Sequence, residues 1–154
     1  AADSGDVVIA PNGNAALLYF ADEARERINP LAQWLQQQDF AGQVVFGPAL
    51  GDIGLPHDGP LGIALAMRHD DAPNPFGIRG QSVSVRSPFS DASQPGCAQH
   101  GGLGANEQHP FLFVRGGGLR PGKRDLPTSL VDIAPTVFHH LGVTADGMQG
   151  RVLQ

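Results

Sequence analysis

Short apolar runs separated by turn residues fill the first half of the chain. Residues 7–10 and 15–20 are two such runs, and the turn residues at 11–14 between them predict a hairpin or two successive strands. Residues 44–46 and 61–67 are further apolar runs of strand length. These segments therefore predict strands bounded by turns.

The segment that follows the second run has helical spacing instead. Asp22 and Glu23 suit the start of a helix, because negative charge is stabilised at its N-terminal end. Pro30 lacks an amide hydrogen, so we expect a kink there or a second helix start capped by Asn29. Apolar residues recur at steps of three and four along one predicted face: Ala24, Ile28, Leu31 and Leu35.

Glycine and proline interrupt the chain after the third strand. Residues 47–60 predict a loop, and residues 69–99 predict mostly irregular structure with a short strand at 82–86. A connection of this length in a compact domain is often functional, or it belongs beside another segment. Residues 110–114 predict a buried strand, which the glycines at 116–118 end.

Residues 128–142 predict the clearest helix of the chain. A hydroxyl cap with Asp132 in the first turn favours its start, and Gly142 provides its C-terminal stop. Its apolar face is formed at helical spacing by Ile133, Val137 and Leu141. Because strands and helices alternate along the chain, we expect α/β or α+β layering.

The charge balance limits the partners that the chain can bind. Lys and Arg number 10 against 15 Asp and Glu, which gives a formal net charge of -5. A nucleic-acid polymer is not expected as the main partner, because such proteins need clustered cations to displace counterions. A small phosphate ester stays compatible with this charge, since a bound metal supplies positive charge locally.

Hydrophobicity and cysteine content set further limits. Hydrophobic residues make up 41% of the chain, which is enough for a packed core. No run approaches the roughly 18 apolar residues of a membrane span. Cys97 is the only cysteine, which excludes an intrachain disulfide and a thiolate zinc cluster. Because the chain starts at Ala1 without a signal pattern, we expect a cleavage product or a piece of a longer product.

Two late segments together resemble one family. Residues 100–119 contain a His-Gly-Gly turn, an apolar run and a glycine-rich loop, and residues 129–142 contain Val-Asp-Ile-Ala-Pro-Thr on a predicted helix. A Gly-Arg-Val-Leu tail follows within residues 146–153. The order and spacing over residues 96–154 resemble the end of the type I phosphodiesterase and nucleotide pyrophosphatase branch of the alkaline phosphatase superfamily, and residues 7–48 fit more loosely.

The resemblance implies a fold and a place within it. Residues 1–154 would be a single segment, the C-terminal portion of an alkaline phosphatase-like three-layer α/β sandwich with a central sheet flanked by helices. Family members carry a Thr or Ser nucleophile, an Asp-x-x-x-His pair and an Asp-His-Gly motif earlier in the chain, and none can be placed in this sequence. We therefore expect the N-terminal part of the same protein as a partner, assign no catalytic residue here, and expect the isolated chain to be inactive.

The resemblance also implies zinc, with His100 as one ligand. The family reaction is displacement at phosphorus, in which two zinc ions stabilise the attacking and leaving oxygens. Neutral imidazole suits zinc, and Gly101 and Gly102 would let the backbone bend sharply beside the metals. The alternative is that His100 is an ordinary loop histidine. One imidazole cannot by itself make a zinc site, which needs about three or four ligands.

The other candidate residues have structural alternatives. His109 is a candidate for contact with substrate, but we expect a partly buried structural histidine instead. The run His69-Asp70-Asp71 is better interpreted as a solvated turn than as a metal cluster, because adjacent side chains rarely point to one centre.

On the late helix, the consecutive residues His139 and His140 diverge by about 100° and cannot share an ion. Asp132 is interpreted as a helix-start residue rather than an acid catalyst.

The functional hypothesis is part of a metal-dependent hydrolase of phosphate esters. In it, the chain supplies one zinc ligand, completes the sheet and belongs to an enzyme that the family resemblance places in the periplasm or outside the cell. One alternative is a non-catalytic structural or partner-binding module with the same fold. Another is a related phosphatase, sulfatase or phosphomutase of the same superfamily.

Overall fold

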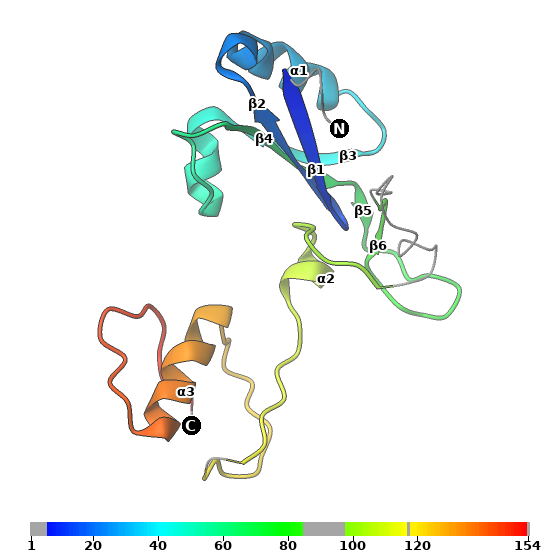
Figure 1. Cartoon of the computed structure of the whole chain (residues 1–154). Helices are drawn as coiled ribbons and strands as arrows, with labels where there is room; N and C mark the ends of the chain where they lie inside the picture. Colours follow the sequence, from blue (N-terminus) through cyan, green and yellow to red (C-terminus); the bar gives the residue numbers. More distant parts are fainter. Residues whose placement is uncertain (1–5, 85–97, 117, 154) are drawn as a thin grey trace. The chain divides into compact units, whose positions relative to one another are not determined.

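The computed structural model describes residues 6–84, 98–116 and 118–153 (Figure 1). The chain divides into two compact units, Ala1–Pro110 and Phe111–Gln154. Each unit is described by itself below.

Unit 1 is built on a four-stranded antiparallel sheet in the order β1-β2-β4-β3. Its strands are β1 (Val7–Asn12), β2 (Ala15–Phe20), β3 (Ala41–Phe46) and β4 (Leu61–Met67). The predicted hairpin is confirmed, because β1 and β2 pair across the turn at 13–14. The late strand β4 lies between β2 and β3, so both of its edges are hydrogen-bonded.

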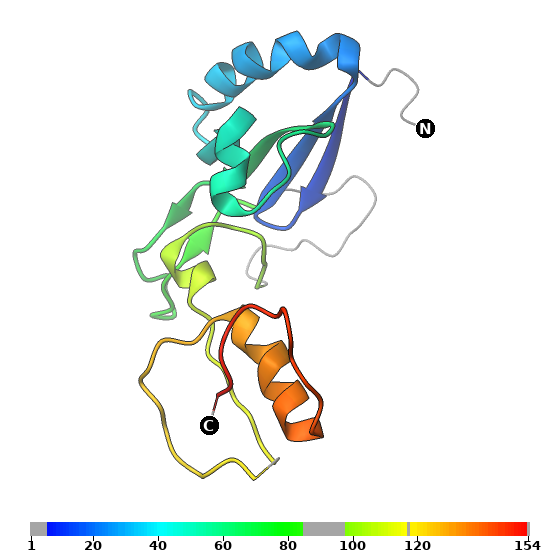
Figure 2. The same cartoon turned by 90° about the vertical axis from the view of Figure 1, so that its left-hand side faces the viewer.

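A helical segment covers one face of this sheet. It starts as the 3-10 helix η1 (Asp22–Arg27) and continues as α1 (Ile28–Leu35) (Figure 2). The expected second start is confirmed, with Pro30 in the first turn of α1, but Arg27 rather than Asn29 takes the N-cap position. The core beneath it consists of Ala16, Leu18, Phe20, Ala24, Ala32, Leu35, Ile63, Leu65 and Met67.

The opposite face of the sheet is covered by a second 3-10 helix, η2 (Gly47–Ile53). The prediction of a loop over residues 47–60 is therefore wrong for its first half. Leu50 is fully buried and packs with Val45, Leu61 and Ala64 of the sheet. Burial of Leu50 stabilises the packing of η2 on the sheet, since burying a leucine side chain contributes about 1.5–3 kcal/mol to the free energy of folding.

A bulge in β4 brings two consecutive residues, Gly62 and Ile63, to the face of the sheet that α1 covers. The pairing register with β2 shifts between Leu18 and Tyr19, which leaves Gly62 as the extra residue. A Cβ at Gly62 would lie 2.5 Å from the ring of Phe20 and 2.9 Å from Ile28. Only glycine fits here without movement of the core.

The remaining elements in the described part of unit 1 are short. A two-stranded ribbon pairs β5 (His69–Asp70) with β6 (Gln81–Ser82), and α2 (Ala105–Gln108) follows later. The predicted strand at 82–86 begins one residue earlier and ends at Ser82; its residues 85–86 lie outside the described part.

Unit 2 contains the predicted late helix, as η3 (Leu130–Asp132) and α3 (Ile133–Leu141). Gly142 ends it in the left-handed conformation at φ 69°, as expected. Two other expectations are wrong. Residues 111–114 form no strand, and the apolar face of α3 is not in a core, since Val137 is 48% and Leu141 70% exposed.

The observed fold class is mixed α/β with a small antiparallel sheet and a few helices. Helical segments lie on both faces of the sheet in unit 1. This agrees with the expected α/β class and does not single out one family of folds.

Replacement of Gly62 by alanine should lower the free energy of unfolding by about 1–3 kcal/mol, because the added methyl group meets a buried ring that cannot move aside. Urea unfolding followed by circular dichroism would measure the change. Gly59→Ala is the matched control, since a Cβ at that position has no neighbour within 4 Å. Equal midpoints for the two variants would contradict the packing described for β4.

Candidate functional site

The turn that contains His100 is attached to the β1–β2 hairpin. The backbone nitrogen of Asn14 donates a hydrogen bond of 2.8 Å to the carbonyl oxygen of His100. The carbonyl oxygen of Asn14 in turn accepts one of 2.9 Å from the amide of Met67 in β4. The main chain of His100 is thus linked to the sheet, whereas the residue is exposed. Its imidazole is accessible to a ligand.

Two glycines allow this close approach. Gly101 has φ 92°, and a Cβ there would lie 2.4 Å from the carbonyl oxygen of Asn12. A Cβ at Gly102 would lie 2.1 Å from Oε2 of Glu107. Gly101 thus has a backbone conformation that favours glycine, and the close approach of Gly101 to β1 and of Gly102 to Glu107 leaves no room for a side chain.

Glu107 lies at the centre of a polar cluster that the sequence did not reveal. Its Oε1 accepts hydrogen bonds from Nδ2 of Asn14 and from Oγ of Ser82, the latter at 3.0 Å. Its Oε2 accepts one of 3.0 Å from the amide of Gly104. The signal that could have found it is local, because Gly104 and Glu107 have the spacing of a helix N-cap and its third residue.

Asn14 connects this carboxylate to the sheet. The residue is 5% exposed, and among the described residues none donates a hydrogen bond to its Oδ1. Its amide group is therefore oriented by Glu107 alone within the described part of the chain. Asn14 therefore joins Glu107 through its side chain to His100 and Met67 through its main chain.

His109 lies at the end of α2 and is exposed. Its Nδ1 lies 2.6 Å from the carbonyl oxygen of Ala105. A carbonyl oxygen only accepts, so the hydrogen is on Nδ1, and in the neutral ring Nε2 then carries the lone pair. His109 can therefore present an acceptor nitrogen to a ligand, and the expected partial burial is wrong.

The acidic residues beside His69 serve local structure. Oδ1 of Asp70 accepts a 2.8 Å hydrogen bond from the amide of Ala72, and Oδ1 of Asp71 accepts one of 2.8 Å from Nδ2 of Asn106. Both acids are exposed, as expected, but His69 and Asp70 form strand β5 rather than the predicted turn.

No metal-binding cluster is present in the described ranges. Within residues 6–84, 98–116 and 118–153, no three His, Cys, Asp or Glu side chains lie together as a metal site would require. His139 and His140 are in edge-to-face ring contact, with centroids 5.6 Å apart and planes at 71°.

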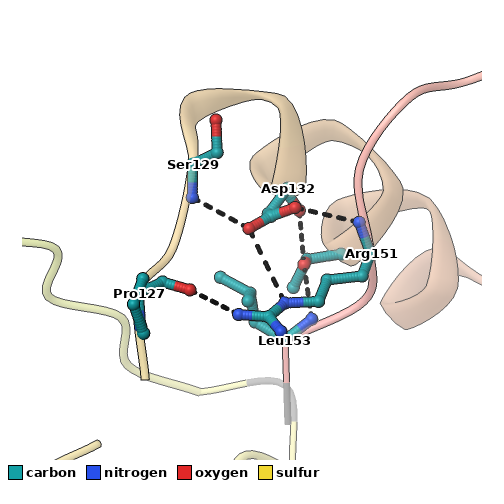
Figure 3. A network of polar contacts seen from close by, with 6 residues as sticks. Pro127, Ser129, Asp132, Arg151 and Leu153 are labelled. Atoms are coloured by element: carbon teal, nitrogen blue, oxygen red, sulfur yellow. Dashed lines mark hydrogen bonds and ion pairs between the residues drawn. The ribbon is translucent and has the colours of Figure 1, made fainter. Parts of the chain in front are cut away.

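Unit 2 has a polar network of its own around Asp132 (Figure 3). The Asp132 carboxylate, only 7% exposed, accepts hydrogen bonds from the amides of Ser129 at 2.8 Å and Arg151 at 2.9 Å. Nε of Arg151 lies 3.9 Å from the same carboxylate, and Nη2 of Arg151 donates to the carbonyl oxygen of Pro127. Asp132 is therefore a helix-start residue, as predicted, and also fixes the tail.

Further contacts join the tail to the helix. The hydroxyl of Thr136 accepts a 2.9 Å hydrogen bond from the amide of Leu153 and donates one of 2.6 Å to the carbonyl oxygen of Asp132. A Cβ at Gly150 would lie 2.3 Å from the carbonyl oxygen of Val131. Residues of the Val-Asp-Ile-Ala-Pro-Thr and Gly-Arg-Val-Leu segments are thus bonded to one another, which gives both a structural role.

Hydrogen bonds hold the Asp132 carboxyl in its charged form. The backbone amide of Arg151 and then that of Ser129 lower its pKa below the ordinary value of 3.8, burial opposes them, and the Arg151 charge adds a smaller lowering.

Comparison with known proteins gave no match. No protein-family model, curated protein or solved structure matches this chain. Among the described residues, no helix is both long and apolar enough to cross a membrane. A functional assignment therefore rests on the residues and contacts described above.

Replacement of Asp132 by asparagine should destabilise unit 2 at pH 7 and have a smaller effect in acid. Because the pKa is lower in the folded state, the stabilisation is complete above the ordinary value and is lost as pH falls through the folded value. Amide exchange of α3 would measure this between pH 7 and pH 3. Asp146→Asn changes an exposed carboxylate of the same unit and should have little effect. An effect of Asp132→Asn that does not depend on pH would contradict the assignment.

Proposed function

We propose that this chain is the C-terminal part of a zinc-dependent phosphodiesterase of the alkaline phosphatase superfamily, and that His100 is one of its zinc ligands. The observation that supports this most directly is the His100 turn. Its backbone is hydrogen-bonded to the sheet through Asn14, while the residue itself is exposed. A histidine with a fixed main chain and an accessible ring suits metal binding.

The chemistry of the group agrees with the reaction. Neutral imidazole is a good zinc ligand, and zinc stabilises charge on phosphate oxygens during displacement at phosphorus. The remaining ligands and the nucleophile would come from the N-terminal part of the same protein. The contribution of this chain would be one ligand held by the sheet of unit 1.

Unit 2 supports the proposal of a larger protein. Its side chains expose far more apolar surface than a self-contained unit needs: Phe111 is 93% and Phe113 is 80% exposed. The predicted core face of α3 is exposed as well. Packing against the N-terminal part of the same protein would bury these side chains and complete the expected sandwich.

The proposed substrate is a small phosphate ester. The net charge of -5 does not favour a nucleic-acid polymer, which requires many cationic contacts. A small ester needs positive charge only at its phosphate, where the metal ions would provide it.

The decisive test of this function is His100→Ala in the full-length protein that contains residues 1–154. Hydrolysis of an aryl phosphodiester in the presence of zinc should fall by about 100-fold or more, because one metal loses a ligand and transition-state charge loses stabilisation. Bound zinc, measured by elemental analysis, should fall as well. The isolated 154-residue chain should show no zinc-dependent turnover.

His57→Ala is the matched control, because His57 is also exposed and lies in the η2–β4 connection. It should retain full activity. Full activity in the His100→Ala protein would reject the ligand assignment. Zinc-dependent turnover by the isolated chain would reject the proposal that it is only a part of the enzyme, and no activity in the full-length protein would favour the non-catalytic alternative.

Val137→Asp tests the proposed packing of unit 2. In the isolated chain the aspartate would remain largely in water, so the free energy of unfolding should change by less than about 0.5 kcal/mol. In the full-length protein it would be buried without a partner and should cost several kcal/mol. Thermal melts of both proteins would show the difference. Equal small effects in both would mean that this face stays exposed.

A further inference from the structure

The turn that bears His100 depends on one carboxylate several residues away. We propose that Glu107 is a positioning residue for His100, an inference that rests on the proposed zinc site. Glu107 would not touch the metal or the substrate. It would act through Asn14, which binds the Glu107 side chain with its amide group and the His100 carbonyl oxygen with its main chain.

Glu107 is bonded to Gly104 through both its side chain and its main chain. Its Oε2 accepts from the amide of Gly104, while its own amide donates 2.9 Å to the carbonyl oxygen of Gly104. The same Oε2 occupies the space that a side chain at Gly102 would need. The main chain at Gly102 and Gly104 therefore lies directly against the carboxylate.

The other oxygen ties this closed turn to two separate segments. Oε1 accepts from Asn14 in the β1–β2 hairpin and from Ser82 at the end of β6. Among the described residues, the three hydrogen-bond partners of the carboxylate are all donors, and an ionised carboxylate only accepts. The charge and the acceptor geometry of Glu107 are thus both matched to its surroundings.

Such precision matters for a metal ligand. A functional group must be held to about 0.5 Å, and loss of a residue that orients a ligand typically costs 10–100-fold in metal affinity or activity. Asn14 relays the position of Glu107 to His100 because its orientation depends on the carboxylate. The half-buried Glu107 has both oxygens engaged in these bonds, which fits positioning rather than proton transfer.

The chain allows a charge-swap test of this idea. Glu107→Gln replaces one acceptor oxygen by an NH2 group. That group then faces a hydrogen-bond donor instead of an acceptor. Asn14→Asp removes the donor and sets two carboxylates against each other. In the double variant Asn14→Asp/Glu107→Gln, the glutamine amide can donate to the aspartate while its oxygen accepts from Gly104. The single changes should therefore disrupt the turn, and the double change should restore it.

The first measurement is amide hydrogen exchange in the 154-residue chain. The amides of Asn14 and Gly104, which bond to His100 and Glu107, should exchange about tenfold faster in each single variant. The double variant should return close to the wild-type rate. The β2–β4 ladder should not change in any variant, which separates a local effect from global destabilisation. Glu26→Gln removes an exposed charge and is the matched control.

The second measurement is made on the full-length protein. Each single variant should lower zinc affinity and kcat by about 10–100-fold with KM nearly unchanged, and the double variant should recover most of the loss. Unchanged Asn14 and Gly104 exchange in both single variants would overturn the inference. So would single variants with full zinc affinity and kcat in an active wild type. If wild type neither binds zinc nor hydrolyses the ester, the proposed function fails and the positioning role for a metal ligand fails with it, whereas the exchange data still show whether Glu107 holds the turn.

Discussion

Burial of β4 is the constraint on which the structure of unit 1 depends. Every residue from Leu61 to Met67 is buried, because β2 and β3 pair with its edges and helical segments cover its two faces. The strand carries no polar side chain, so every one of its polar groups is in the backbone and is suited to pairing with the neighbouring strands. Its last residue, Met67, also binds the main chain of Asn14. An entirely apolar strand thus supports the Asn14 main chain, whose side chain binds Glu107.

The sequence predicted the elements better than their arrangement. Apolar runs and local stop signals placed the strands and the late helix, because these depend on residues close together in the chain. The position of β4 between β2 and β3 was not predicted, since strand order depends on contacts between distant segments. Residues 111–114 have a strand-like composition but have no paired strand, and composition alone does not make a strand.

The candidate site was predictable only where a residue type points to a chemistry. His100 was proposed only because its His-Gly-Gly segment resembles one in a known family, since a histidine by itself is weak evidence for a metal site. Glu107 was missed because its importance comes from Asn14 and Ser82, which lie 93 and 25 positions away in the sequence. Asp132 was recognised as a helix-start residue from its position, but its bond to the amide of Arg151 requires the tail to fold back. The sequence therefore pointed to some candidate side chains, whereas the hydrogen bonds that hold them could be identified only from the folded structure.

The exposed apolar segment at the start of unit 2 has a consequence for the stability of the chain against degradation in a cell. Residues 111–114 place two phenylalanines, a leucine and a valine in water, and Arg115 follows them. Surfaces of this kind are what molecular chaperones hold in newly made proteins. A copy in which these side chains stay exposed would therefore be a target for chaperone binding and degradation.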